Sequence, residues 1–320
     1  MDQSNQTSAN IFYLLKLTNI PNLQPLCFFL FLFMYIITLS GNILLIIVVG
    51  VNTQLQTPMY FFLCNLSFID ICFSSSIVPK ILVNTLSVDT SISLLGCAFQ
   101  MYISLVLGAT ECIILSVMAY DRYVAICSPL HYNTIMNKKF CIYLAAGSWT
   151  VCFMNSAIHV FFTFQLPYCR SHHVNHFFCE MPPFFTLSCR DTWMNELLMY
   201  ISTGIIAMCP FIAIIVSYIY IISAILKIKS SKSRHKTFST CASHIIVVSL
   251  YYSTIMVMYL HSHSSYSPKT DNIISVLYTT VTPMMNPIIY SIRNTEVKNT
   301  IKRNLQSNLL YKNNKKCIFY

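Results

Sequence analysis

Residues 26–50 read LCFFLFLFMYIITLSGNILLIIVVG, a stretch in which no side chain carries a formal charge. The apolar core of a lipid bilayer is about 30 Å thick, and an α-helix rises about 1.5 Å per residue. A helix therefore needs about 20 apolar residues to cross it. The stretch has that length and that composition, so it predicts a membrane-spanning helix.

The composition of the whole chain agrees with a membrane protein. Of its 320 residues, 55% are hydrophobic and only 9% are charged, whereas an ordinary soluble domain carries about 25% charged residues. These proportions exclude a soluble globular protein, a disordered chain and a nucleic-acid-binding domain. The net charge of +10 need not indicate a polyanionic partner, because membrane proteins collect basic residues on their cytoplasmic side.

Six further stretches have the length and polarity of membrane spans. They cover residues 59–82, 97–126, 140–162, 196–226, 237–260 and 272–292. We therefore predict an all-α membrane protein, a bundle of seven transmembrane helices over residues 26–292. Residues 1–25 are mostly polar and lack the features of a cleavable signal peptide. Residues 293–320 are a basic tail, in which we expect a short amphipathic helix.

The basic residues predict the orientation of this bundle. Fifteen of the twenty Lys and Arg residues fall on one side: Arg122, Lys138 and Lys139, five between Lys227 and Lys236, and seven between Arg293 and Lys316. The side richer in Lys and Arg is cytoplasmic in most membrane proteins. With seven spans, this places the C-terminus in the cytoplasm and the N-terminus outside.

The predicted outer side carries two kinds of modification site. Asn5 opens the sequon Asn-Gln-Thr, and we expect it to be glycosylated. Cys97, Cys169, Cys179 and Cys189 fall at or in outer segments, where the oxidising environment preserves disulfides. Four cysteines allow three pairings, and the residues alone leave these open.

Short motifs along the chain resemble those of one family. They are GN at 41–42, PMYFFL at 58–63, MAYDRYVAIC at 118–127, SY at 217–218, KTFSTCASH at 236–244 and PMMNPIIY at 283–290. Together they resemble the olfactory receptors, a branch of the rhodopsin-like G protein-coupled receptors. Ser128, Thr237 and Met285 stand where the family usually has Asn, Ala and Leu, which are minor departures.

The resemblance implies roles for several residues. It pairs Cys97 with Cys179, which would tie the second outer loop to the bundle, and Cys169 with Cys189. It also implies a cytoplasmic switch, in which Asp121 holds Arg122 at rest and activation frees Arg122 to meet the G protein and Tyr218. The other switch residues that it implies are Tyr123, His244 and Tyr290.

Two carboxylates, Asp70 and Glu111, lie deep in spans and at similar depth in the membrane. Buried acids in a membrane are functional candidates, and two at one depth repel each other. Either one of them is protonated and the two are hydrogen-bonded, or a cation lies between them. Receptors that resemble this chain hold a sodium ion near this aspartate, and Asn42 and Asn286 could complete such a site.

Ligand sites in helix bundles lie between helices, so we expect a pocket in the outer half of spans three, five, six and seven. Side chains that recur at helical spacing are its candidate lining. They are Met101, Ser104, Leu105, Gly108, Ser202, Thr203, Ile206, Ala207, Tyr252, Ile255 and Tyr259. Such stripes also serve ordinary helix packing. None of these residues is charged, so we predict a small, neutral, mostly apolar ligand with at most one hydroxyl or carbonyl.

The sequence thus predicts an odorant receptor in the plasma membrane. A small volatile odorant would shift it to an active form that stimulates an olfactory-type heterotrimeric G protein and raises cAMP. The same receptor type sensing a metabolite outside the nose is an alternative. A transporter or channel is a more distant one, because no internal symmetry or polar pore is evident. No nucleophile with a general base accompanies the buried acids, so we expect no enzymatic activity and no cofactor other than the possible sodium ion.

Overall fold

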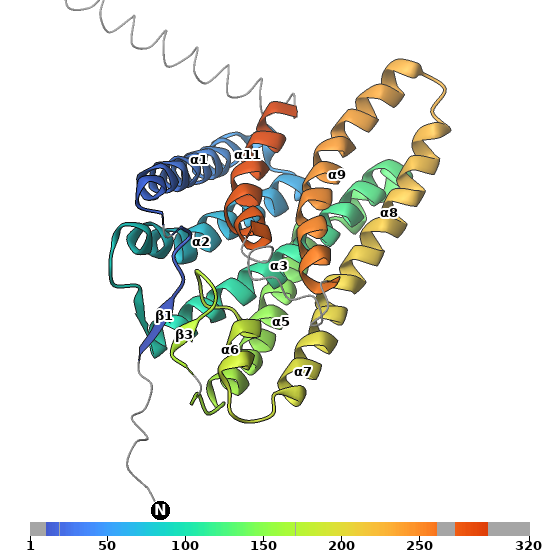
Figure 1. The fold of residues 1–320 in the computed structure, drawn as a ribbon. Coiled ribbons are helices and arrows are strands. Elements are labelled where there is room, and N and C mark those ends of the chain that lie inside the picture. Colours follow the sequence, from blue (N-terminus) through green and yellow to red (C-terminus); the bar gives the residue numbers. More distant parts are fainter. Residues whose placement is uncertain (1–10, 19, 170, 261–272, 294–320) are drawn as a thin grey trace, which may run out of the picture.

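The computed structural model describes residues 11–18, 20–169, 171–260 and 273–293. Asn5 and the tail beyond Arg293 lie outside these residues, so the predicted glycosylation and amphipathic helix lie outside them too. Within them, seven helices are long and apolar enough to cross a membrane. The predicted fold class, a seven-helix membrane bundle, is confirmed (Figure 1).

Long helices form the bundle, and two of the spans are assembled from shorter pieces. The bounds are α1 Gln24–Val51, α2 Pro58–Leu86, α3 Leu94–Cys127, α5 Lys138–Phe164, α7 Trp193–Thr203, α8 Cys209–Leu226, α9 Ser231–Leu260 and α11 Thr282–Arg293. Two π-helical segments, η4 Gly204–Met208 and η6 Leu277–Val281, precede α8 and α11. The fifth span is therefore α7, η4 and α8 in sequence, and the seventh runs from Ile273 through η6 into α11.

Several helices begin with polar caps outside the apolar stretches. The Ser93 hydroxyl accepts a hydrogen bond from the Gly96 N–H at 3.1 Å at the start of α3. The Asn137 side chain accepts one from the Phe140 N–H at 3.0 Å at the start of α5. Caps satisfy N–H groups that have no partner inside a helix. For this reason α3 starts at Leu94 and α5 at Lys138, before the positions 97 and 140 estimated from apolar length alone.

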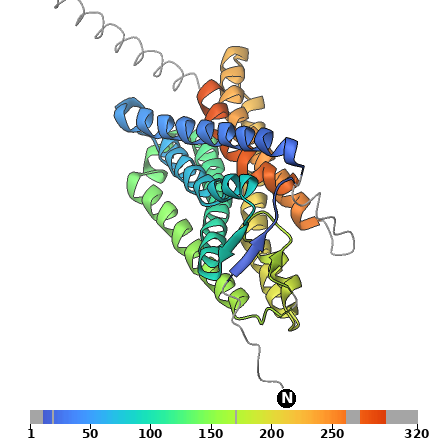
Figure 2. The same ribbon diagram turned by 60° about the vertical axis from the view of Figure 1, so that its left-hand side comes forward.

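Helix α3 lies at the centre of the bundle, packed against α2, α5 and α8 (Figures 1 and 2). Its buried residues run along almost its whole length. By contrast, α1 exposes large apolar side chains such as Phe29 and Phe33 on its outer face. In a bilayer such side chains contact lipid and need no protein cover. The bundle therefore has a packed centre and an apolar circumference.

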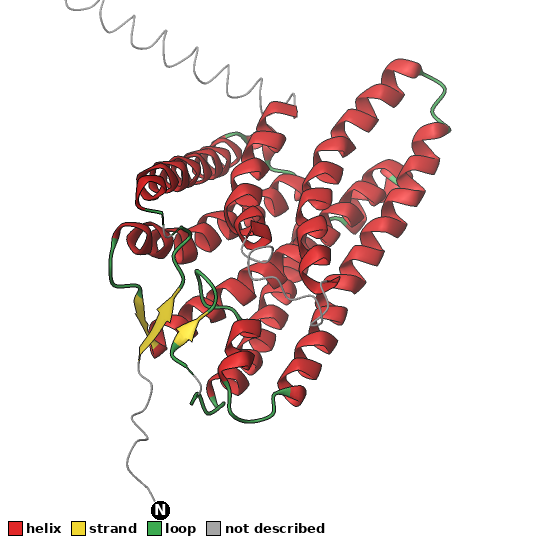
Figure 3. Cartoon of the chain, in the orientation of Figure 1, coloured by secondary structure: helices red, strands yellow, loops and turns green. Residues whose placement is uncertain are grey.

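A small sheet lies at the end of the bundle where the N-terminal segment enters (Figure 3). Strand β1 Ile11–Leu14 lies between β2 Ser91–Ser93, antiparallel to it, and β3 His173–Val174, parallel to it. This sheet was not predicted from the sequence. Its strands are two to four residues long, too short for their alternation to stand out in a sequence.

Both disulfides implied by the family motifs are present at the same end. The Cys97–Cys179 bond joins the start of α3 to the second outer loop, with a Cα–Cα distance of 5.5 Å. The Cys169–Cys189 bond closes a loop within that segment, at 5.9 Å. Along the sequence, the short helix α6 Met181–Leu187 lies between Cys179 and Cys189. The loop is thereby held over the bundle as a packed cover.

Candidate functional site

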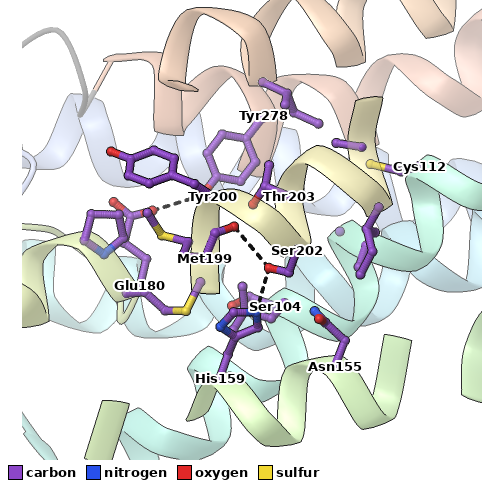
Figure 4. A pocket seen from close by; sticks show the side chains of 18 of the residues that line it. Ser104, Cys112, Asn155, His159, Glu180, Met199, Tyr200, Ser202, Thr203 and Tyr278 are labelled. Carbon is purple, nitrogen blue, oxygen red and sulfur yellow. Dashed lines mark hydrogen bonds between the residues drawn. The ribbon is translucent and has the colours of Figure 1, made fainter. Parts of the chain in front are cut away.

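A cavity of about 470 Å³ lies between the helices near the sheet-bearing end of the bundle. Its wall comes from α2, α3, α5, α7, η4, α9 and η6, and the second outer loop covers it (Figure 4). Its volume falls within the range of small-molecule sites, which is about 300–1,000 Å³. Eight residues proposed from helical spacing line it: Ser104, Leu105, Gly108, Ser202, Thr203, Ile206, Ala207 and Ile255.

Three other proposed residues do not contribute to the described wall. Met101 is fully buried in a separate cluster beneath the second outer loop. Tyr252 packs against Phe211, with ring centroids 4.7 Å apart. Its neighbour Tyr251 faces the cavity instead. Successive residues of a helix point about 100° apart, so a shift of one residue moves a side chain off the wall. The side chain of Tyr259 lies outside the described part.

Part of the cavity wall was not predicted from the sequence. It is formed by α5 and the second outer loop. Asn155 and His159 come from α5, and His176, Phe178 and Glu180 come from the loop. The Cys97–Cys179 pairing was a usable signal. It predicts that the residues beside Cys179 lie close to the outer end of α3, and these are two of the missed residues.

The expectation that the wall holds no acid is wrong, because Glu111 and Glu180 both line the cavity. Among the contacts of Glu180 are one from His176 of the same loop and one from Tyr278 of η6. Its Oε1 lies 3.2 Å from His176 Nε2, and its Oε2 accepts a hydrogen bond from the Tyr278 hydroxyl at 3.4 Å. Glu180 was missed because it lies in a loop, and Glu111 because it had been assigned to the ion site alone.

His176 links this loop to the seventh span. Its Nε2 lies 3.1 Å from the Ser275 hydroxyl, and its Nδ1 lies 3.3 Å from the Phe178 carbonyl oxygen and 3.5 Å from the Phe178 nitrogen. Only 2% of His176 is exposed, and this burial lowers its pKa to about 3. The ring is therefore neutral at physiological pH.

A chain of hydrogen bonds crosses the opposite wall. His159 Nε2 lies 2.7 Å from the Ser202 hydroxyl, and that hydroxyl donates to the Met199 carbonyl at 3.0 Å (Figure 4). The chain connects α5 to α7 beside the cavity. It places one imidazole and one hydroxyl in an otherwise mostly apolar wall.

Below the cavity, the structure joins two members of the proposed ion site. Asn286 donates through Nδ2 to both carboxylate oxygens of Asp70 at 3.1 Å. Asn42 donates to the Pro283 carbonyl at 3.2 Å, so it faces the same span as Asn286. Glu111 lies close enough to Asp70 for their charges to interact.

Several oxygens around this cluster are buried without a hydrogen-bond partner in the described part of the chain. They are Asn42 Oδ1, Ser74 Oγ, Glu111 Oε1 and Asn286 Oδ1. Buried polar atoms are nearly always satisfied, and hard cations take oxygen ligands. The donor set therefore fits a small cation such as sodium.

At the other end of the bundle, His244 connects three helices. Its Nε2 lies 3.1 Å from the Leu115 carbonyl of α3, and its Nδ1 lies 2.7 Å from the Tyr218 hydroxyl of α8. A carbonyl can only accept, so Nε2 carries the hydrogen and Nδ1 accepts from Tyr218. Tyr290 is also buried at this end, and its hydroxyl has no partner among the described residues. The predicted switch residues Tyr218 and His244 are thus in contact.

The structure shows no ion pair between Asp121 and Arg122 among its described residues, and the predicted resting contact between them stays a prediction. Asp121 Oδ1 instead accepts a hydrogen bond from the Tyr132 hydroxyl at 2.8 Å. Burial, together with the Asp121 carboxylate, raises the pKa of Tyr132 and keeps its hydroxyl a donor. The Nε atom of Arg122 is buried and has no hydrogen-bond partner among these residues.

The physical reason is geometric. Adjacent residues on a helix point about 100° apart, and the short helix α4 Tyr132–Ile135 brings the Tyr132 phenol to the carboxylate. Tyr123, the third residue of the motif, turns towards Tyr220 of α8, with ring centroids 5.9 Å apart. Asp121 and Tyr123 of the motif therefore contact different parts of the chain, the α4 segment and α8.

Known proteins match this chain over almost its whole length. The family model described as "Olfactory receptor" matches residues 31–308. The chain is 44% identical over 303 residues to "Olfactory receptor 1f45" of Rattus norvegicus, covering 95% of this chain and 97% of the relative. It is 48% identical over 299 residues to "Olfactory receptor-like protein OLF1" of Canis lupus familiaris, covering 93% and 96%. It is 45% identical over 306 residues to "Olfactory receptor 5G3" of Homo sapiens, covering 96% and 98%.

Proposed function

The chain belongs to the olfactory receptor family, and from this premise we propose that it binds a small, neutral odorant in the cavity beneath the second outer loop and then activates a stimulatory G protein that raises cAMP. Membership makes it a G protein-coupled odorant receptor and not an enzyme. It is a multi-pass protein of the plasma membrane. The family recognised from the motifs is confirmed.

The observation that carries the proposal is the cavity itself. It has a volume of about 470 Å³ and a mostly apolar wall built from six of the seven spans. Two of its wall segments, η4 and η6, are π-helical. Such bulges occur often at functional sites, because they break the regular helix and redirect side chains.

The cavity and the inner contacts share the same helices, which gives ligand binding a route to the far end. Helix α3 carries Gly108 in the wall and Leu115 at the His244 contact, and α9 carries Ile255 in the wall and His244 itself. A ligand shifts a conformational equilibrium only by its differential affinity for the two states. The proposal therefore requires the cavity to differ between the resting and active forms.

Arg122 provides the test of G protein activation. In cells that report cAMP, a panel of odorants should evoke a signal that Arg122→Ala abolishes while surface expression is retained. Lys139→Ala is the matched control, since it removes a positive charge from the first turn of α5 and should leave the signal. A ligand-evoked signal that Arg122→Ala leaves unchanged would contradict the proposed switch.

The orientation is part of the proposal and needs its own test. The N-terminal segment and the disulfide-bearing loop should face outside, and the α8–α9 loop and the tail should face the cytoplasm. An epitope added at the N-terminus should be detected by antibody on intact cells, and one added at the C-terminus only after permeabilisation. The reverse pattern would overturn the placement of both cavity and switch.

We also propose that sodium binds at Asp70 with Glu111, Asn42 and Asn286. The unpartnered oxygens of this cluster support the site. Replacing sodium with a bulky organic cation in the assay buffer should shift odorant potency for the unmodified receptor and not for Asp70→Asn. If odorant potency of the unmodified receptor does not shift, the alternative is favoured, in which one of the two carboxyl groups of Asp70 and Glu111 is protonated and hydrogen-bonded to the other.

A further inference from the structure

We propose that the cavity selects ligands carrying a hydroxyl that donates a hydrogen bond, such as alcohols and phenols, over carbonyl compounds of the same carbon skeleton. The inference rests on the proposed function, because it names the ligand class of that same cavity. Most hydroxyl hydrogens in the cavity wall already form hydrogen bonds within the protein, whereas lone pairs of the wall oxygens and of one imidazole nitrogen remain available to a ligand.

Most hydroxyl hydrogens in the wall are used within the protein. Four of them go to backbone carbonyls of their own or a neighbouring helix: Ser104 to Met101 at 3.0 Å, Ser202 to Met199 at 3.0 Å, Thr186 to Pro183 at 2.8 Å and Tyr251 to Gly108 at 2.6 Å. A fifth, on Tyr278, goes to Glu180. A hydroxyl has one hydrogen but two lone pairs. These groups can therefore still accept a hydrogen bond from a ligand, but they have no hydrogen left to give.

The hydrogen-bond chain at His159 makes the imidazole an acceptor towards a ligand. Ser202 gives its hydrogen to the Met199 carbonyl, so it can only accept from His159 Nε2 at 2.7 Å. Both bonds exist together only if Nε2 carries the ring hydrogen. In a neutral imidazole the other nitrogen, Nδ1, is then a bare acceptor. Within the described residues, the only hydrogen bond of the His159 side chain is the one through Nε2.

Glu111 also lines the cavity, but its carboxylate belongs to the cluster with Asp70 and is not counted as an acceptor for the ligand. Asn155 and Tyr200 also line the cavity and keep both a donor and an acceptor, so they favour neither ligand class. The uncommitted groups of the wall are thus mainly acceptors.

This imbalance discriminates between functional groups. A hydroxyl can donate to His159 Nδ1 and still present its lone pairs to other groups. An aldehyde or ketone has only lone pairs, so it leaves the buried acceptors unpaired and places its oxygen against them. The alcohol gains one hydrogen bond that the carbonyl compound lacks, so we expect a difference in potency of up to about tenfold, which corresponds to about 1.4 kcal/mol.

A neutral hydroxyl fits better than an ammonium group. The His159 acceptor ends a chain of uncharged groups, and Glu180 is already contacted by His176 and Tyr278. An ammonium ion would lose its hydration on entering a mostly apolar wall, which is costly unless it meets a free carboxylate. The structure therefore favours an alcohol. The experiment includes an amine as the competing ligand class.

The experiment compares matched compounds on cells expressing the full chain and a cAMP reporter. Alcohols and aldehydes of six, eight and ten carbons are tested in pairs, with octylamine and a methyl ether of the same length as octanol. We expect each alcohol to be up to about tenfold more potent than its aldehyde. Aldehydes of equal or greater potency would overturn the inference and leave the proposed function standing. Octylamine as the most potent compound would also overturn it and point to Glu111 or Glu180.

No response to any of these compounds or to a broad odorant panel, with the receptor at the cell surface, would instead contradict the proposed function. The two failures are therefore distinguishable. The ratio of alcohol potency to aldehyde potency is measured within one variant, so differences in expression between variants cancel.

Two substitutions test the assigned atoms. His159→Phe removes the acceptor, and the potency ratio should fall towards one because the alcohols weaken. Ser202→Ala removes the group that holds the hydrogen on Nε2, so His159 can present an N–H to a ligand. For this variant the ratio should fall because the aldehydes strengthen, and Ser202→Thr should restore it.

Ser253→Ala is the matched control. Its hydroxyl donates to the Leu250 carbonyl at 3.0 Å, three residues back along the helix as for Ser202, but the residue is exposed and does not line the cavity. Its ratio should match that of the unmodified receptor. If Ser202→Ala also keeps the ratio, the tautomer assigned to His159 is wrong.

Discussion

The two ends of the bundle are held together by different means. At the outer end, two disulfides and a three-stranded sheet tie the loops to α3 and to the N-terminal segment. At the inner end, the described contacts between spans include side-chain hydrogen bonds such as Tyr218 with His244. Covalent bonds and buried aromatic packing resist rearrangement, whereas single hydrogen bonds exchange at little cost. The outer end is thus suited to keep its shape and the inner end to change it.

The largest expected effect comes from opening the outer covalent link. The Cys97–Cys179 bond spans 82 residues and the Cys169–Cys189 bond spans 20. Loop-closure entropy assigns them roughly 4.5 and 3.3 kcal/mol. Cys97→Ser should therefore lower the thermal unfolding midpoint and surface expression more than Cys169→Ser does. If the two variants lose equal stability, the outer end is not held chiefly through α3.

The next effect concerns the sheet. Phe12 of β1 is fully buried and meets the ring of Phe184 at a centroid distance of 5.1 Å. Removing a buried phenylalanine side chain costs about 3–5 kcal/mol, so Phe12→Ala should lower the unfolding midpoint of the purified receptor. Tyr13→Ala is the control, because Tyr13 is 38% exposed and should change it little. Equal effects would show that β1 is not packed as described.

At the inner end, breaking a contact should change signalling more than stability. His244→Phe removes the partner that occupies the Tyr218 hydroxyl, which releases Tyr218 for Arg122. One hydrogen bond of about 1.4 kcal/mol corresponds to a tenfold shift in equilibrium, so ligand-independent cAMP should rise by up to about tenfold.

Tyr218→Phe separates the two roles of that hydroxyl. It breaks the same hydrogen bond but also removes the group that Arg122 would meet, so ligand-independent cAMP should not rise. Unchanged signalling in both variants, at normal surface expression, would contradict the idea that the inner end is the movable one.

The same contrast explains what the sequence could predict. The seven spans follow from apolar length, and the wall residues of α3 and α7 follow from helical spacing, since both are local properties. Strand β1 could not be predicted, because its partners β2 and β3 lie far along the chain and each is only two or three residues long. His159 was missed because the rotation of α5 about its axis depends on its neighbours.

The contacts of Asp121 show a second limit. The motif around it identified a functional region, and the sequence places Arg122 beside it. The actual partner, Tyr132, is eleven residues away, and the path of a short loop decides whether its phenol reaches the carboxylate. Motifs thus located the functional residues, while their partners came from tertiary packing.

The smallest predicted effect tests whether the outer cover can itself be loosened. Burial lowers the pKa of His176 to about 3, whereas an unfolded histidine has a pKa near 6.5. Between these values the unfolded chain binds a proton that the folded chain does not, so stability falls as pH falls below about 6.5. At pH 5.5 we expect a loss of about 1 kcal/mol.

This loss should appear as a lower unfolding midpoint of the purified receptor at pH 5.5 than at pH 7.4. His176→Gln, which keeps a side-chain donor for Glu180 but does not titrate, should reduce the difference between the two pH values. His173→Gln is the matched control, because His173 is exposed and should leave the difference unchanged. A pH dependence that survives His176→Gln would place its origin elsewhere and leave the outer cover insensitive to acid.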